Sequence, residues 1–163
     1  MSKKIRINII LDEFDTVSEL NQQEQLLLEK ASEAARNAYA PYSGFNVGAS
    51  VLLENGTIVI GSNQENAAYP SGLCAERVAI FAAGAQYPNV KIKTIAITAN
   101  SKNVKIDTPV APCGSCRQVL AEYEKKNGGP IKLVLKGEQG KIITMDSVLT
   151  LLPLVFSSSN LGK

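Results

Sequence analysis

The sequence predicts one α/β domain with three α/β/α layers, built around a mixed five-stranded sheet. Three observations lead to this prediction. First, segments of helical and strand-like periodicity alternate along the chain, which is the pattern of an α/β fold. Second, 163 residues is a typical length for a single domain that buries its own core. Third, only residues 136–140 separate the last two predicted strands, and so short a connection requires an antiparallel pair.

The main domain is predicted to span residues 21–156. Residues 1–20 are expected to form an N-terminal extension, and residues 157–163 a flexible tail. Within the extension, isoleucine stands at every second position from Ile5 to Ile9, which is typical of a short edge strand. The extension is therefore expected to add an edge strand or a subunit contact to the domain.

The elements of the main domain follow from capping signals and periodicity. Asn21 followed by Glu24 is a capping-box pattern, and apolar residues at helical spacing continue it to about residue 37. The turn Glu54-Asn55-Gly56 is a hairpin signal. Strands are expected at residues 45–53, 57–61, 93–99, 131–135 and 141–144, and further helices at 75–85, at 113–126 and, capped by Asp146, up to about Pro153.

The composition excludes several classes of partner. The 17 basic and 15 acidic residues leave a net charge of +2, and no run of Lys or Arg is longer than two, so a concentrated nucleic-acid-binding surface is not expected. The apolar runs are too short to span a membrane, and no secretory signal is visible. An odd number of cysteines favours a reducing compartment, so the sequence predicts a cytoplasmic protein.

All three cysteines fall in two short segments, and the chain has no histidine. Cys113 and Cys116 are one helical turn apart, and Cys74 is expected at the start of another helix, where the dipole favours thiolate. Three thiolates can hold one zinc ion with an open fourth position, which is the mark of a catalytic site. Because histidine is missing, Glu76 becomes the leading proton-transfer residue.

The net charge of such a zinc site predicts which side chains should lie beside it. Three thiolates and one Zn²⁺ sum to a net charge of about −1, which a nearby cation would offset. Arg77 and Arg117 each follow a site residue directly and are the candidates, and Gln118 is expected to add a hydrogen bond around the site. The alternatives are three unrelated buried thiols, or a redox CxxC pair with one spare thiol. A closed structural zinc site would need a carboxylate as its fourth ligand.

Five sequence blocks resemble the zinc-dependent cytidine deaminases, which act on free nucleosides as homotetramers. The resemblance covers residues 31–156, and cysteine replaces the histidine of the H-x-E…P-C-x-x-C signature. The blocks are Ala40-Pro41-Tyr42-Ser43-Gly44-Phe45-Asn46-Val47-Gly48-Ala49, Asn63-Gln64-Glu65-Asn66-Ala67-Ala68-Tyr69, Cys74-Ala75-Glu76-Arg77, Pro112-Cys113-Gly114-Ser115-Cys116-Arg117-Gln118 and Leu151-Leu152-Pro153.

The resemblance implies hydrolytic deamination of cytidine and 2′-deoxycytidine to uridine and 2′-deoxyuridine, with release of ammonia. It implies one zinc ion per chain on Cys74, Cys113 and Cys116. A zinc-bound hydroxide then attacks C4 of cytosine, and Glu76 carries protons to N3 and to the departing amine. The implied partners are a small nucleoside and further copies of the chain in a homotetramer with shared active sites, and the implied role is pyrimidine salvage or catabolism.

The resemblance also implies substrate contacts. These are Phe45 against the base, Asn63 and Glu65 on the ribose hydroxyls, the backbone of Ala67 and Ala75 at the pyrimidine, and Tyr69 and Phe156 contributed by a neighbouring subunit. Each has a simpler interpretation: Asn63 and Glu65 as turn residues, Phe45 as a core residue and Tyr69 as a surface aromatic.

Three other functions remain open at this stage. One is deamination of a modified cytosine nucleoside of the blasticidin type. Another is editing of a polynucleotide, against which stand the missing basic patch and Cys74 in place of histidine. The third is a zinc-stabilised module without catalysis, which leaves Glu76 beside an open metal position unexplained.

Overall fold

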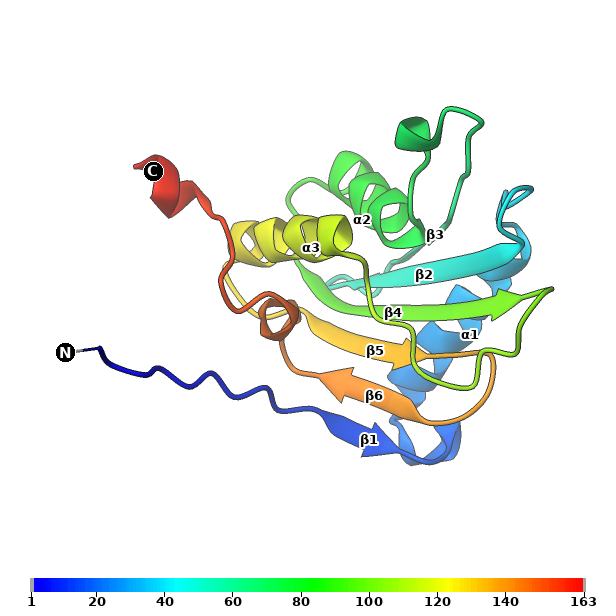
Figure 1. Cartoon of the computed structure of the whole chain (residues 1–163), viewed down its shortest axis with the longest axis horizontal. Coiled ribbons are helices and arrows are strands. Elements are labelled where there is room, and N and C mark those ends of the chain that lie inside the picture. Colours follow the sequence, from blue (N-terminus) through cyan, green and yellow to red (C-terminus); the bar gives the residue numbers. More distant parts are fainter. Residues whose placement is uncertain (1, 163) are drawn as a thin grey trace.

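The computed structural model describes residues 2–162 and shows one mixed sheet between two helical layers (Figure 1). The strand order is β1-β6-β5-β4-β2-β3. Among the strands within residues 2–162, only β4 and β5 run parallel to each other, and β5 and β6 are antiparallel as predicted. The strands are β1 (Asp12–Phe14), β2 (Phe45–Leu53), β3 (Ile58–Ser62), β4 (Ile92–Ser101), β5 (Lys132–Lys136) and β6 (Ile142–Met145).

Helices cover both faces of this sheet. Helix α1 (Gln22–Arg36) lies on one face, and α2 (Ala75–Gln86) and α3 (Gly114–Asn127) lie on the other (Figure 1). Neighbouring strand residues point to opposite faces, and both faces are buried. Leu52 of β2, Ala96 of β4 and Val134 of β5 therefore pack toward α1. Their neighbours pack toward α2 and α3: Val51, Leu53, Ile95, Ile97, Leu133 and Leu135. The predicted three-layer α/β/α fold is confirmed.

The sheet has six strands where five were predicted, because the extension contributes β1. The expected edge strand at Ile5–Ile9 is wrong in position, since β1 lies at Asp12–Phe14. The reason is the available partner. Phe14 pairs with Ile142 of β6 and packs against the core beneath α1. β6 ends at Met145, which lies opposite Leu11 in this register, so it offers no backbone to residues 5–9.

Helix α1 begins where the capping pattern predicts. The Asn21 side chain accepts a hydrogen bond from the Glu24 amide at 2.9 Å, and the Glu24 carboxylate accepts one from the Asn21 amide at 3.3 Å. Glu24 also pairs with Lys132 of β5 at 2.6 Å. The start of α1 is therefore attached to the sheet as well as capped.

Two glycines let the helices approach the sheet closely. A Cβ added at Gly48 of β2 would lie 1.9 Å from the Ala31 carbonyl oxygen of α1. One added at Gly61 of β3 would lie 2.5 Å from the Ala79 amide nitrogen of α2. Because no side chain separates the backbones, Gly61 determines how near α2 lies to β3.

Helix α3 is attached to the sheet through a buried carboxylate. Glu124 accepts hydrogen bonds from the amides of Ile131 at 2.8 Å and Val148 at 3.0 Å, and from the Ser147 hydroxyl. The short helix predicted after Asp146 is a 3-10 helix, Val148–Leu151, and its cap is Ser147 instead of Asp146. None of the helices within residues 2–162 is both long enough and apolar enough to cross a membrane.

Candidate metal centre and active site

The three thiols meet where the N-termini of α2 and α3 converge. Cys74 is the N-cap of α2 and Cys113 the N-cap of α3, and Cys116 lies buried in the first turn of α3. The Sγ atoms of Cys74 and Cys113 are 3.9 Å apart, and those of Cys113 and Cys116 are 3.6 Å apart. The positive ends of two helix dipoles thus face one cluster of sulfurs, which favours thiolates.

The geometry of this cluster fits a tetrahedral zinc ion. Zinc–sulfur bonds of about 2.3 Å at tetrahedral angles place the sulfurs roughly 3.8 Å apart. All three sulfurs lie within 4.8 Å of one another. Across residues 2–162, no fourth Cys, Asp or Glu joins the group. A bound zinc ion would therefore keep one position for a ligand from outside the chain, as catalytic sites do.

The thiols of the cluster differ strongly in acidity. The pKa of Cys74 is lowered to about 5, first by a hydrogen bond from Cys116, then by hydrogen bonds from Arg77 and Cys113 and by the charge of Arg77. The pKa of Cys116 is raised by its hydrogen bond to Cys74, by burial and by the charge of Glu76. Cys74 is therefore the sulfur that ionises first.

Glu76 brings a buried carboxyl group to the same helix turn. Its side chain is only 5% exposed, in the first turn of α2. Burial raises the pKa of Glu76, and the nearby Cys74 charge raises it further. A carboxyl group with a raised pKa can take up and release a proton closer to neutrality than an exposed one.

Of the two arginines proposed to offset the thiolate charge, only Arg77 lies against a sulfur. Its Nη2 atom is 3.7 Å from Cys74 Sγ, and the pKa of Arg77 is raised chiefly by that contact. Arg117 instead donates to the carbonyl oxygens of Pro112 at 2.8 Å and Leu151 at 3.2 Å. Arg117 therefore fastens the start of α3 to the segment after β6.

A cavity of about 540 Å³ opens beside Cys74. Its size is that of a small-molecule site. Three of the predicted substrate contacts, Asn63, Glu65 and Tyr69, line it together with Cys74 and Arg77. The structure thus brings the loop after β3 and the start of α2 to one space.

The Asn63 side chain already holds backbone groups of β2. It donates to the Phe45 carbonyl oxygen at 2.9 Å and accepts from the Val47 amide at 2.7 Å. These bonds join the loop after β3 to the start of β2, so the Asn63 side chain fixes one wall of the cavity.

Glu65 joins the loop before β2 to the loop after β3. Its carboxylate accepts from the Tyr42 amide at 2.9 Å, the Ser43 amide at 3.2 Å and the Ser43 hydroxyl. The Ser43 hydroxyl and then the two backbone amides lower the pKa of Glu65. An ionised carboxylate is therefore held at the wall of the cavity.

Four other predicted residues do not line this cavity. Phe45 is half-buried at the start of β2, Ala75 is buried in the first turn of α2, and Ala67 is exposed on the loop after β3. Phe156 is 60% exposed, and its carbonyl oxygen accepts from the side-chain Nε2 of Gln118 at 2.8 Å. Gln118 therefore holds the C-terminal segment instead of a sulfur.

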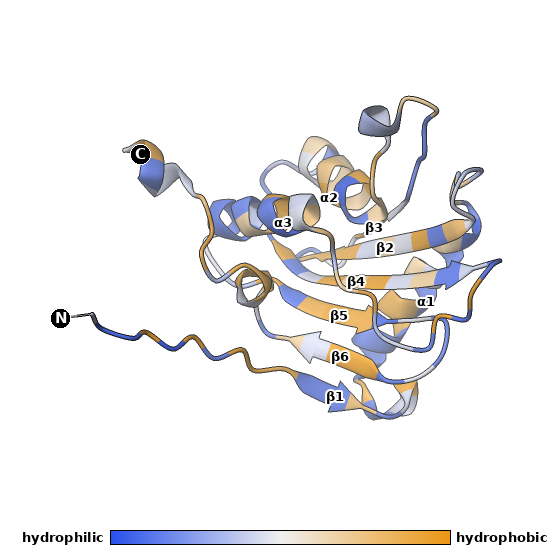
Figure 2. Ribbon diagram, in the orientation of Figure 1, coloured by the Kyte–Doolittle hydropathy of each residue, from blue (hydrophilic) through white to orange (hydrophobic). Residues whose placement is uncertain are grey.

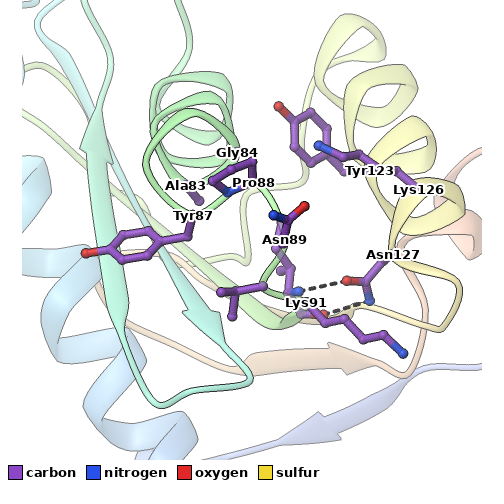
Figure 3. Close-up of a pocket in the computed structure, with 11 residues that line it drawn as sticks. Ala83, Gly84, Tyr87, Pro88, Asn89, Lys91, Tyr123, Lys126 and Asn127 are labelled. Carbon is purple, nitrogen blue, oxygen red and sulfur yellow. Dashed lines mark hydrogen bonds between the residues drawn. The ribbon is translucent and has the colours of Figure 1, made fainter.

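A second hollow, of about 310 Å³, lies at the opposite ends of the same helices (Figure 3). Tyr87 and Tyr123 line it, and Asn127 bonds the amide and the carbonyl oxygen of Ile92 at 2.8 and 2.9 Å. This hollow contains none of the predicted site residues. The Asn127 side-chain amide is occupied in joining α3 to β4. The cysteine cluster lies instead at the N-terminal ends of α2 and α3.

Sequence reasoning missed Tyr42 and Ser43 as site residues. Both line the cavity, and both hold Glu65. The signal that could have found them is the turn Pro41-Tyr42-Ser43-Gly44, whose backbone amides have no strand partner and can accept a carboxylate from elsewhere.

Comparisons with known proteins agree with the zinc site that the geometry indicates. Residues 21–127, well over half of the chain, match the family model described as the cytidine and deoxycytidylate deaminase zinc-binding region. A cytidine deaminase from Halalkalibacterium halodurans is 39% identical over 138 residues, which are 85% of this chain and 97% of that protein. One from Sporosarcina psychrophila is 42% identical over 138 residues, 83% of this chain and 93% of that protein.

Solved structures point to the same family. A crystal structure of cytidine deaminase from Burkholderia pseudomallei matches with a TM-score of 0.70 and 36% identity, and covers 84% of this chain and 100% of that one. The prediction of a zinc site is confirmed by the family and by the sulfur cluster together. The chain belongs to the cytidine and deoxycytidylate deaminase family.

Proposed function

We propose that this protein hydrolyses cytidine and 2′-deoxycytidine to uridine and 2′-deoxyuridine, with release of ammonia. One observation carries the proposal: a buried carboxyl group, Glu76, lies two residues from Cys74 in a three-sulfur cluster beside a cavity of nucleoside size. A structural zinc site has no need of a buried carboxyl group so close to its ligands. The names of the relatives support the same reaction.

The chain would supply the metal ligands and the proton traffic. Zinc held by Cys74, Cys113 and Cys116 would act as a Lewis acid and lower the pKa of water at the open position. Glu76 would accept a proton there, pass it to N3 of cytosine, and deliver a second proton to the departing amine. Arg77, at 3.7 Å from Cys74 Sγ, would offset the negative charge of the thiolates.

Asn63 and Glu65 would recognise the sugar. The Glu65 carboxylate has room for another donor, because one oxygen accepts two hydrogen bonds and the other only one. A sugar hydroxyl is such a donor, and a hydrogen bond to an ionised group is a strong one. Phe45 and the backbone of Ala67 and Ala75 are proposed to hold the base.

We further propose a homotetramer with shared active sites. Tyr69 is 76% exposed and packs edge-to-face on Tyr42 at a centroid distance of 6.0 Å. Phe156 is also exposed. Aromatic side chains are enriched in the core of protein–protein interfaces. Because both side chains are exposed in the single chain, they are proposed to complete a neighbouring subunit's site. The cytoplasmic location, the role in pyrimidine salvage and the division into residues 1–20, 21–156 and 157–163 remain predictions of the sequence.

The test is the loss of ultraviolet absorbance of cytidine with purified, zinc-loaded protein. The wild type is expected to convert cytidine and 2′-deoxycytidine. Glu76→Gln should keep its zinc and lose roughly a thousandfold or more in kcat, because it cannot transfer the protons. No turnover by wild-type protein that holds one zinc per chain would overturn the proposal.

A second arm tests the sugar contact. Glu65→Gln is expected to lower kcat/KM for cytidine by roughly ten- to a hundredfold, because a charged acceptor becomes neutral. Glu54→Gln, on the exposed hairpin turn, is the matched control and should leave it unchanged. Deoxycytidylate should be a poor substrate, since the cavity lining includes Glu65 and its one arginine already contacts Cys74. Equal kcat/KM for Glu65→Gln and Glu54→Gln would contradict this role.

A further inference from the structure

Residues 2–11, here called the N-terminal arm, lie outside both the site and the family match. The family model begins at residue 21. The arm runs on from β1 as an extended segment that leaves the body of the domain (Figure 1). All of its residues are exposed, and Ile5 is 82% and Ile7 55% exposed. A run of exposed isoleucines is expected to have a partner.

The arm has the alternation of a strand. Figure 2 shows hydrophilic and hydrophobic residues in turn along it. As a continuation of β1 it would place Ile5, Ile7, Ile9 and Leu11 on one face. To form a strand, the arm also needs a neighbouring backbone with which to form hydrogen bonds. β1 is the outermost strand of the described sheet, so the edge of β1 that faces away from β6 is open to another strand.

We infer that the N-terminal arm pairs, antiparallel, with the same arm of a second copy of this chain, around a two-fold axis at Asn8. In this register, the arm and β1 of one copy are complementary to the arm and β1 of the other. Lys4 faces Asp12 of the other copy, and Lys3 faces Glu13, which also pairs with Lys141 of its own chain. Between these charged pairs, Ile5 faces Leu11 and Ile7 faces Ile9, and only Arg6 against Ile10 is a mismatch.

The neighbouring registers have more mismatched pairs. Moving the two-fold axis by one residue, to Ile9, keeps Arg6 against Asp12 and Ile7 against Leu11, but it sets Ile5 against Glu13, Lys4 against Phe14 and Asn8 against Ile10. Moving it to Ile7 sets Lys3 against Leu11 and Lys4 against Ile10. Cross-strand pairs of opposite charge and of apolar side chains stabilise a sheet, and a closed two-fold interface uses the same patch on both copies. The pairing would continue one sheet through both copies.

The charge pattern also selects a second copy over a lipid surface. Lys3, Lys4 and Arg6 alone would suit an anionic membrane. Asp12 and Glu13 lie at the other end of the same extended segment and are exposed, and the Asp12 carboxylate in particular would be repelled by such a membrane, because Glu13 already pairs with Lys141. A partner that is basic at one end and acidic at the other, in reverse order, is the same arm with its β1 in a second copy.

The test is disulfide cross-linking of the full-length, zinc-loaded protein, in which the native thiols are occupied. Directly opposed strand residues have Cα atoms about 4.5–5.5 Å apart, within reach of a disulfide. Asn8→Cys should therefore form a covalent dimer on mild oxidation, mapped to residue 8 by mass spectrometry. Ile5→Cys is the matched control and should not, because its two copies would be roughly 20 Å apart.

Charge exchange tests the register. In the Asn8→Cys background, Lys4→Asp should slow cross-linking roughly tenfold, and adding Asp12→Lys should restore it. Cross-linking at Ile5→Cys as fast as at Asn8→Cys, or no restoration by the exchange, would overturn the inference. So would the absence of a cross-link at Asn8→Cys, and sedimentation of the protein on phosphatidylserine vesicles would then assign the arm to a membrane surface. The readout does not involve turnover, so it stands or falls apart from the proposed function.

Discussion

Cys74 contacts or lies near most of the other charged and metal-binding groups of the site. Its sulfur is 3.7 Å from Arg77 Nη2 and 3.9 Å from Cys113 Sγ, and it caps α2 two residues before Glu76. A hydrogen bond from Cys116, followed by the contacts with Arg77 and Cys113, lowers its pKa to about 5. A ligand that is already a thiolate at neutral pH binds zinc without first losing a proton, which favours metal loading.

The acidity of Cys74 can be measured in chelator-treated protein. Its alkylation by iodoacetamide, followed by mass spectrometry of the Cys74 peptide, should titrate with a pKa near 5. Because the thiolate is the reactive form, the rate falls as the pH drops below that value. Cys116→Ala and Arg77→Gln should each raise the pKa, since the first removes the strongest hydrogen bond and the second removes a cation.

Cys116→Ser is the control for that measurement, because its hydroxyl keeps a donor at the same place. A Cys74 pKa at the ordinary thiol value of about 8.5 in the wild type would contradict the proposed electrostatics.

At the scale of elements, the position of α2 on β3 decides where Cys74 and Glu76 lie. A Cβ at Gly61 would lie 2.5 Å from the Ala79 amide nitrogen and 2.8 Å from the Ala75 carbonyl oxygen. Both are backbone atoms, which cannot rotate away as a side chain can. The glycine therefore acts on the site through the helix.

Gly61→Ala is expected to destabilise the protein by about 1–3 kcal/mol, the usual cost of overpacking, because α2 must shift. The shift should also lower zinc retention during dialysis and reduce kcat. The control is Gly129→Ala, where no atom lies within 4 Å of the added Cβ. Urea unfolding and zinc analysis of both variants make the test, and identical results for the two would show that α2 is not held by this contact.

At the scale of the whole molecule, the extension has two parts with different surroundings. Residues 2–11 are exposed, whereas Leu20 is 5% exposed and packs with Phe14 and Val17 on the core beneath α1. The part from residue 12 onward thus belongs to the folded domain energetically, although the family match begins at residue 21.

Truncation separates these parts. A chain that starts at residue 12 should be about 3 kcal/mol more stable to urea than one that starts at residue 21, because the shorter chain loses buried Leu20 and its two apolar neighbours. Comparing the two truncated chains removes any contribution of the N-terminal arm. Equal unfolding midpoints would show that residues 12–20 contribute nothing to the domain.

Most of the fold could be predicted because its signals are local. The capping pair Asn21 and Glu24 and the turn at Asn55-Gly56 placed α1 and the β2–β3 hairpin, since helix starts and tight turns depend on neighbouring residues. The position of β1 could not be predicted, because alternation from Ile5 to Ile9 says nothing of where β6 ends. Strand pairing requires a partner that is distant in the sequence.

By itself, the sequence determined the ligand set and its chemistry. Three cysteines, no histidine and Glu76 next to one of them define a zinc site with a carboxyl group beside it, because ligand type and helix-start position are local properties. Only the tertiary structure decided that Arg77 and not Arg117 faces a sulfur, and that Gln118 turns to Phe156. Burial and partners from other elements set the direction of a side chain and the pKa of its group, and both arise only when the chain folds.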